Sequence, residues 1–116
     1  MRSHPSPEFW QALEELVATS RIVVDRAKGT EHPRCPARPY PLDYGHLEGT
    51  RAGDGGEIDV WIGSGSGGAV TACGVTLDLL RRDSEIKVLV DCASEDIDAV
   101  EEFHNWGRMR IALIRR

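Results

Sequence analysis

Three apolar runs rich in β-branched residues lie close together in the second half of the chain, and they constrain its fold more than any other feature. They read EIDVWIG from residue 57, GAVTACGVTLDLL from residue 68 and EIKVLVDC from residue 85. This composition is typical of β-strands, and the connections, GSGSGG and the turn over 81–84, are short. We therefore expect an antiparallel meander that curls into a small β-barrel, with GSGSGG as a flexible hairpin turn.

Helices are expected at both ends of this β-rich segment. The stretch SPEFWQALEELVATS places Ser6 as the N-cap and Pro7 at the first helical position, followed by apolar residues at helical spacing. The stretch SEDIDAVEEFHNWG begins at Ser94 and ends at Gly107, which predicts a second helix. RIVVDRA and RMRIALIRR are predicted strands. With 116 residues the chain is long enough for one domain, so residues 1–116 are predicted to form a single α+β unit.

Charge and cysteine content narrow the classes of function. The chain carries 19 acidic and 14 basic residues, a net charge of -5, which argues against a nucleic-acid partner. Cys35, Cys73 and Cys92 are widely spaced and form no C-x-x-C pair, so we expect reduced thiols. No apolar stretch is long enough for a signal peptide or a membrane span, which predicts a cytoplasmic protein without a membrane partner.

Three carboxylates crowd into six residues of RAGDGGEIDVWIG, namely Asp54, Glu57 and Asp59. A glycine-rich turn followed by a strand can bring such oxygens together, and Mg²⁺ or Mn²⁺ suits a few carboxylates completed by waters and phosphate oxygens. The alternative is an acidic turn that is only solvated. Basic residues in HPRCPARP and RRDSEIK lie on either side, and acids for a metal beside bases for an anion are what phosphoryl transfer to water requires.

The segment YPLDYGHLEGTRAGDGGEIDVWIG resembles the soluble, magnesium-dependent, barrel-fold inorganic pyrophosphatases. Tyr40, Tyr44, Asp54 and Asp59 stand at the spacings of that family's tyrosine and aspartate pattern, and Glu57 stands where the family accepts proline or glutamate. The resemblance implies a small antiparallel, five-stranded, OB-like β-barrel with an N-terminal and a C-terminal helix. It also implies homo-oligomers and hydrolysis of pyrophosphate to two phosphates with Mg²⁺, possibly replaced by Mn²⁺.

The resemblance also assigns roles to individual residues. The implied catalytic residues are Asp54, Glu57 and Tyr44; the implied metal ligands are Asp54, Asp59, Asp83 and Glu85; the implied phosphate-binding residues are Arg21, Arg34, Tyr40, Lys87 and Arg108. Two positions depart from the pattern. Gly56 replaces the acidic residue that helps to deprotonate the attacking water, and Gly107 replaces a phosphate-binding lysine, with Arg108 as its substitute.

Three functions follow as alternatives. The first is metal-dependent hydrolysis of pyrophosphate. The second is non-catalytic binding of pyrophosphate or a nucleotide by a relative that has lost the water-activating carboxylate at Gly56. The third is a structural module. The predicted partner in the first two is a small phosphate compound.

Overall fold

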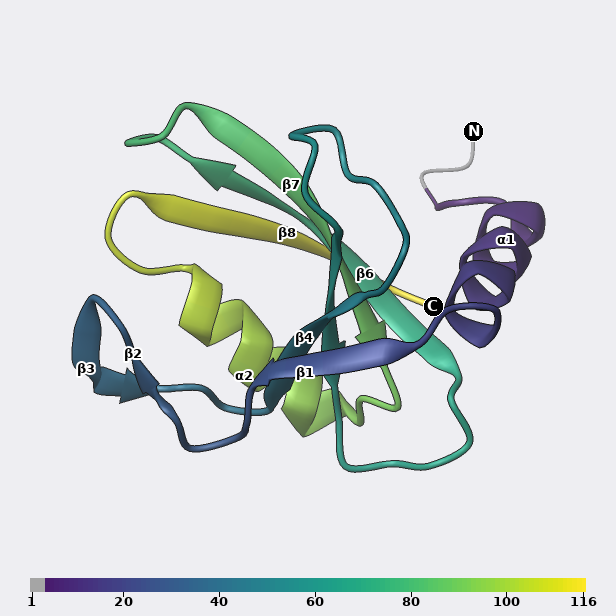
Figure 1. Ribbon diagram of the computed structural model, residues 1–116, viewed down its shortest axis with the longest axis horizontal. Coiled ribbons are helices and arrows are strands. Elements are labelled where there is room, and N and C mark those ends of the chain that lie inside the picture. The colour runs from purple at the N-terminus through teal and green to yellow at the C-terminus, as the bar shows by residue number, and fades with distance from the viewer. Residues whose placement is uncertain (1–3) are drawn as a thin grey trace.

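The computed structural model describes residues 4–116 and contains two helices and eight strands (Figure 1). Helix α1 (Pro7–Ala18) begins as predicted: Ser6 accepts a hydrogen bond from the backbone N–H of Phe9 through its side chain, and Pro7 opens the helix. The buried face of α1 carries Trp10, Leu13 and Val17. Within residues 4–116, neither helix is long and apolar enough to cross a membrane.

Six strands form one mixed sheet in the order β1-β4-β5-β7-β6-β8. Their bounds are β1 Ile22–Arg26, β4 Asp43–Leu47, β5 Ile58–Ile62, β6 Val70–Asp78, β7 Asp83–Val90 and β8 Met109–Arg115. Neighbours are antiparallel except β5 and β7, which run parallel. The α+β class is confirmed. The prediction of a five-stranded antiparallel barrel is wrong, because this sheet has six strands, one parallel pair and no closure.

The GSGSGG segment explains the parallel pair. It is not a hairpin turn, because β7 lies between β5 and β6. Instead it is bound to the end of β7, where the Asp91 carboxylate accepts hydrogen bonds from the backbone N–H groups of Gly68 and Ala69. A Cβ on Gly63 would lie 2.4 Å from the backbone oxygen of Asp91, so only glycine permits this close approach. The segment therefore carries the chain past β7 and places β6 on its far side.

The proline-rich region before β4 is less irregular than its composition predicts. It forms a small two-stranded sheet from β2 (Glu31–His32) and β3 (Cys35–Pro39). Pro36 and Pro39 are tolerated there because a two-stranded sheet has only edge strands, each with N–H groups that need no ladder partner.

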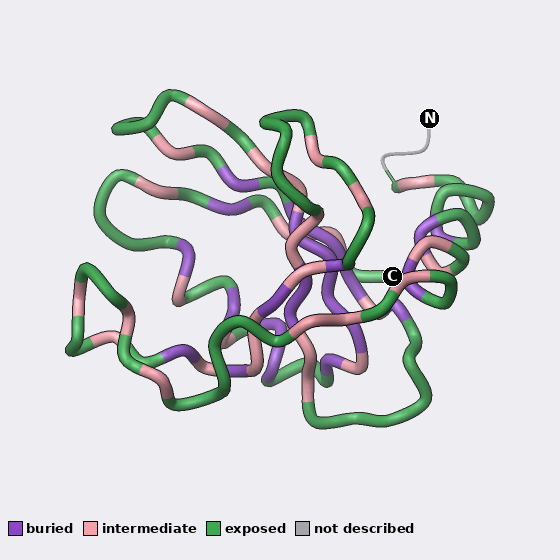
Figure 2. Tube along the Cα trace, in the orientation of Figure 1, coloured by how far each residue is buried: buried purple, intermediate pink, exposed green. Residues whose placement is uncertain are grey.

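Two apolar cores lie on opposite faces of the sheet, one under each helix (Figures 1 and 2). Val60 and Trp61 are successive residues of β5, and Val88 and Leu89 of β7; in each pair the first joins the α1 core and the second the core under α2 (Ser94–His104). Side chains alternate along a strand, so Lys87 lies on the same face as Leu89. Lys87 thus continues the α2 face beyond the apolar core, and this extension is where the candidate site lies.

Candidate functional site

A pocket of about 490 Å³ opens on the α2 face, where β4, β5 and β7 meet the β2–β3 hairpin and the end of α2. Five basic side chains and three acidic ones line it, which makes its local charge opposite to the net charge of the chain. The charged lining residues are Arg34, Arg38, Arg81, Lys87, Arg108, Asp59, Asp78 and Glu85. An excess of guanidinium and ammonium groups around a concave surface favours a small anion.

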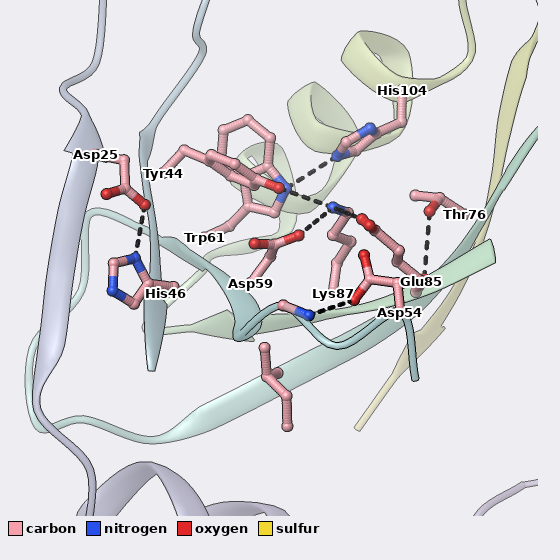
Figure 3. A network of polar contacts seen from close by, with 12 residues as sticks. Asp25, Tyr44, His46, Asp54, Asp59, Trp61, Thr76, Glu85, Lys87 and His104 are labelled. Atoms are coloured by element: carbon pink, nitrogen blue, oxygen red, sulfur yellow. Dashed lines mark hydrogen bonds and ion pairs between the residues drawn. The ribbon is translucent and has the colours of Figure 1, made fainter. Parts of the chain in front are cut away.

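Lys87 is the centre of the polar network in this pocket (Figure 3). The parallel pairing of β5 and β7 sets Asp59 beside Lys87. The Lys87 ammonium donates hydrogen bonds to Asp59 Oδ2 at 2.6 Å, to the Tyr44 hydroxyl at 2.7 Å and to Glu85 Oε2 at 2.9 Å. Only 6% of the Lys87 side chain is exposed, so these three acceptors replace the water that an ammonium ion normally binds.

The network holds Lys87 charged and Tyr44 neutral. Burial on its own lowers the pKa of Lys87, but the contacts with Tyr44 and Asp59 outweigh burial and raise that pKa above its ordinary value. Burial raises the pKa of Tyr44. The Tyr44 hydroxyl accepts the hydrogen bond of Lys87, and a hydrogen bond with Asp59 adds to the effect of burial on the pKa of Tyr44.

Asp54 and Glu85 form an acidic pair beside this network. Their carboxyl groups share a hydrogen bond, which lowers the pKa of Asp54. Lys87 lowers the pKa of Glu85 through its own hydrogen bond, but burial and the contact with Asp54 together raise it. Two carboxyl groups in contact bind one proton more tightly than a single group does, because their negative charges repel.

The acidic pair fits one hard divalent cation better than it fits a preformed metal cage. Among residues 4–116, no group of three or more histidine, cysteine or acidic side chains is arranged to hold a metal ion. Mg²⁺ commonly takes only one or two carboxylates, together with waters and substrate phosphate oxygens. Asp54 and Glu85 would supply that number of protein ligands, and Glu85 would do so while its Oε2 accepts a hydrogen bond from Lys87, as Asp59 Oδ2 also does.

The structure brings together seven of the residues that the resemblance assigned. Those that line the pocket are Arg34, Tyr40, Tyr44, Asp59, Glu85, Lys87 and Arg108. Asp54 reaches the group through Glu85. Two others lie outside the pocket lining: Arg21 pairs with Glu48 at 3.6 Å on the surface, and Asp83 pairs with Arg81 at 3.7 Å.

Glu57 does not take the place of the missing carboxylate at residue 56. Its Oε2 accepts a hydrogen bond from the backbone N–H of Gly49 at 2.9 Å, and its Oε1 lies 3.2 Å from His46 Nε2. The other ring nitrogen of His46 contacts Asp25 at 2.8 Å, and this hydrogen bond raises the pKa of His46. Glu57 therefore ties its loop to His46 of β4 and, through His46, to Asp25 of β1.

Several pocket residues are not among the predicted site residues, including Arg38, Arg81, His104 and Trp106. Arg38 and Arg81 belong to the basic segments HPRCPARP and RRDSEIK, and no pattern in the sequence marks His104 as a site residue. His104 is buried and accepts a hydrogen bond from the Trp61 indole N–H at 3.1 Å. Burial, assisted by nearby positive charge, lowers the pKa of His104 to about 3, so the ring is neutral. The signal for Arg38 and Trp106 was present as a basic proline-rich segment and an aromatic residue just after a helix, but only the fold brings the two together.

Comparison with known proteins supports the fold. No protein-family model and no curated protein matches the sequence. Among solved structures, an inorganic pyrophosphatase from Helicobacter pylori superposes with a TM-score of 0.60 and 13% identity, over 81% of each chain. One from Coxiella burnetii gives 0.58 and 16% over 81% of this chain and 82% of that one, and one from Neisseria gonorrhoeae gives 0.56 and 14% over 83% and 75%. At these identities the likeness establishes a shared fold: the chain is folded like inorganic pyrophosphatases.

Proposed function

We propose that the Lys87 pocket binds inorganic pyrophosphate and, with Mg²⁺ or Mn²⁺, hydrolyses it to two phosphates. The observation that carries this proposal is the buried Lys87 ammonium held by Tyr44, Asp59 and Glu85 in a pocket whose other charges are mostly guanidinium groups. The shared fold with inorganic pyrophosphatases supports the same function.

The basic residues bind the anion in this proposal. Arg34 and Arg108 are exposed and line the pocket, so their guanidinium groups are available for paired hydrogen bonds to phosphoryl oxygens. Arg81 also lines the pocket and adds positive charge there, although it pairs with Asp83. Tyr44 acts on the same anion through Lys87, whose hydrogen bond it accepts. The buried Lys87 ammonium contributes positive charge to the anion site, and Asp59 fixes the position of this ammonium group.

Asp54 and Glu85 would hold the divalent cation together with the substrate. When bound, such a cation neutralises phosphate charge and lowers the pKa of a bound water. Gly56 has no side chain and therefore provides no base to accept the proton of the attacking water. Glu57 cannot replace that base, because it contacts His46 and Gly49. We therefore expect hydrolysis to be slow compared with an enzyme that has a carboxylate at this position, by roughly two to four orders of magnitude.

The second candidate function is binding without hydrolysis. The same two observations favour it, namely the glycine at residue 56 and the direction of Glu57. A chain with an intact anion pocket and no water-activating group would bind pyrophosphate or a nucleotide and release no phosphate.

One pair of measurements separates these functions. Phosphate release from pyrophosphate is followed with Mg²⁺ against a metal-only blank, and pyrophosphate binding is followed by calorimetry. Arg108→Gln removes an exposed charge from the pocket, and Arg51→Gln removes an exposed charge outside its lining. We expect saturable binding that weakens several-fold in Arg108→Gln and stays unchanged in Arg51→Gln, together with release above the blank. If pyrophosphate binds but no phosphate is released above the blank, the protein binds without hydrolysis and the first function is wrong. If pyrophosphate does not bind, both functions are contradicted.

A further inference from the structure

Part of the pocket lining, called the aromatic half below, is aromatic and apolar, and inorganic pyrophosphate has no apolar group that could contact it. This half consists of Tyr40, Phe103, Trp106, Leu80 and Met109, all of which line the same pocket as Lys87. Leu80 is 77% exposed and Trp106 is 53% exposed, although both are large apolar side chains. Apolar surface left uncovered beside a charged pocket commonly marks the place of a ligand group.

The size of the pocket also indicates a ligand larger than inorganic pyrophosphate. Its volume of about 490 Å³ lies within the range of roughly 300–1,000 Å³ that is typical of sites for drug-sized organic ligands. Pyrophosphate consists only of two phosphoryl groups that share an oxygen. An ion of this kind bound at Lys87 leaves the aromatic half in contact with water.

A continuous series of ring contacts leads from Lys87 to this half. The Lys87 ammonium lies 5.3 Å from the ring centre of Tyr44, which lies 5.7 Å from Tyr40, and Tyr40 lies 5.0 Å from Phe103. The Arg38 guanidinium extends this series, since it lies 5.3 Å from the ring centre of Phe103 and 4.9 Å from that of Trp106. Aromatic side chains and guanidinium planes are the groups on which nucleobases stack.

Arg38 is held in this position by the helix end. It donates hydrogen bonds to the backbone oxygen of Phe103 at 2.6 Å and to that of Glu102 at 3.4 Å, near the end of α2. Because these contacts fix the guanidinium group, the stacking surface beside Trp106 is formed before any ligand arrives. A preformed surface costs less conformational entropy when a ligand binds.

We propose that the pocket takes a nucleoside 5′-diphosphate, with the diphosphate at Lys87 and the base on the surface formed by Arg38 and Trp106. This inference rests on the proposed anion binding at Lys87 and extends it to a class of ligand. Stacking of one base on an aromatic side chain is worth roughly a 5- to 150-fold gain in affinity. The diphosphate supplies binding that is common to this ligand and to pyrophosphate, and the base supplies the difference.

The test compares three probes by calorimetry at fixed Mg²⁺: ADP, inorganic pyrophosphate, and geranyl diphosphate, whose organic group is apolar but not aromatic. Trp106→Leu removes the ring, and Phe9→Leu is the matched control, because Phe9 is also an exposed aromatic residue but belongs to α1 and does not line the pocket. We expect ADP to bind at least fivefold more tightly than pyrophosphate. Trp106→Leu should remove this advantage and leave pyrophosphate affinity unchanged, and Phe9→Leu should change neither.

The outcomes distinguish this inference from the proposed function. If pyrophosphate binds and ADP binds no more tightly, the nucleotide inference fails while anion binding stands. If geranyl diphosphate gains as much as ADP, the aromatic half selects apolar rather than planar groups, and the inference fails. An equal loss for ADP and pyrophosphate in Trp106→Leu also overturns it, because Trp106 would then act only by supporting Arg38. Absence of pyrophosphate binding contradicts the proposed function itself.

Discussion

Gly56→Asp is the substitution that most sharply separates hydrolysis from binding. Backbone conformation permits it: Gly55 has a φ of +89° and requires glycine, but Gly56 does not lie in the left-handed region. A Cβ on Gly56 would lie 3.4 Å from Asp54 Oδ1, which is ordinary van der Waals contact. The new side chain therefore fits beside Asp54 without backbone strain.

The magnitude follows from two opposing effects. A carboxylate that acts as general base contributes roughly two to four orders of magnitude to a rate, so phosphate release should rise by about a hundredfold or more. The same carboxylate repels Asp54. Water screens this repulsion strongly in an exposed loop, so without a divalent cation the variant should be only slightly less stable than the wild type.

The assay is phosphate release at saturating pyrophosphate and Mg²⁺, with thermal unfolding in the presence and absence of Mg²⁺. Gly53→Asp is the matched control, because Gly53 lies in the same loop, has no positive φ and has nothing within 4 Å of its added Cβ. Gly56→Asn supplies nearly the same shape without the charge. We expect only Gly56→Asp to raise the rate.

The reasoning is refuted by an unchanged rate in a folded Gly56→Asp variant that still binds pyrophosphate. It is also refuted if Gly53→Asp raises the rate equally, because a nonspecific increase in loop charge would then account for the result.

Three further predictions concern the buried groups and the thiols. Lys87→Met leaves two partly exposed carboxylates without their counter-charge and should lower the free energy of unfolding in urea by about 2–3 kcal/mol, less than for a fully buried pair; a loss below about 0.5 kcal/mol would contradict the network. The pKa of His104 is about 3 in the folded state, below the unfolded value of 6.5. The free energy of unfolding is therefore highest above pH 6.5, and it falls as the pH is lowered because the unfolded ring gains a proton and the folded ring does not. We expect about 2 kcal/mol of its contribution to be lost between pH 7 and pH 5, and His104→Gln to remove that part of the pH dependence; equal slopes for both proteins would disprove the assignment. Burial raises the pKa of Cys73 and raises that of Cys92 to about 12, so a thiol reagent should modify Cys35 first, and pyrophosphate should slow this reaction because Cys35 lines the pocket.

Local signals accounted for the elements of this fold but not for their arrangement. Ser6 and Pro7 mark the start of α1 in the sequence itself, and the apolar runs became β5, β6 and β7. The strand order was missed because it depends on contacts between distant residues. The hydrogen bonds between Asp91 and the GSGSGG segment are the clearest example. No local sequence pattern predicts that this glycine-rich connection binds the end of β7, a strand that comes later in the chain.

The candidate site was likewise predicted only in part. The resemblance to inorganic pyrophosphatases implied site roles for Tyr44, Asp59, Glu85 and Lys87, and the structure places their side chains in one network. The resemblance implied a catalytic role for Glu57, but its contacts with Gly49 and His46 depend on a register between β4 and β5 that the sequence does not reveal. The aromatic half of the pocket was missed for a similar reason, because it combines residues from the segment after β3, the turn between β6 and β7, the end of α2, the turn after it and the start of β8.

The three tryptophans allow the location of the anion site to be tested in one spectrum. Trp10 belongs to the buried face of α1, Trp61 is a buried residue of the pocket lining and Trp106 is an exposed residue of that lining. Their indole N–H signals are followed by ¹H–¹⁵N NMR while pyrophosphate and Mg²⁺ are added, with each signal assigned by substitution. Binding at Lys87 predicts that the Trp61 and Trp106 signals move and saturate together while that of Trp10 stays in place. Unmoved Trp61 and Trp106 signals at saturating pyrophosphate, or a shift confined to Trp10, would contradict the central claim.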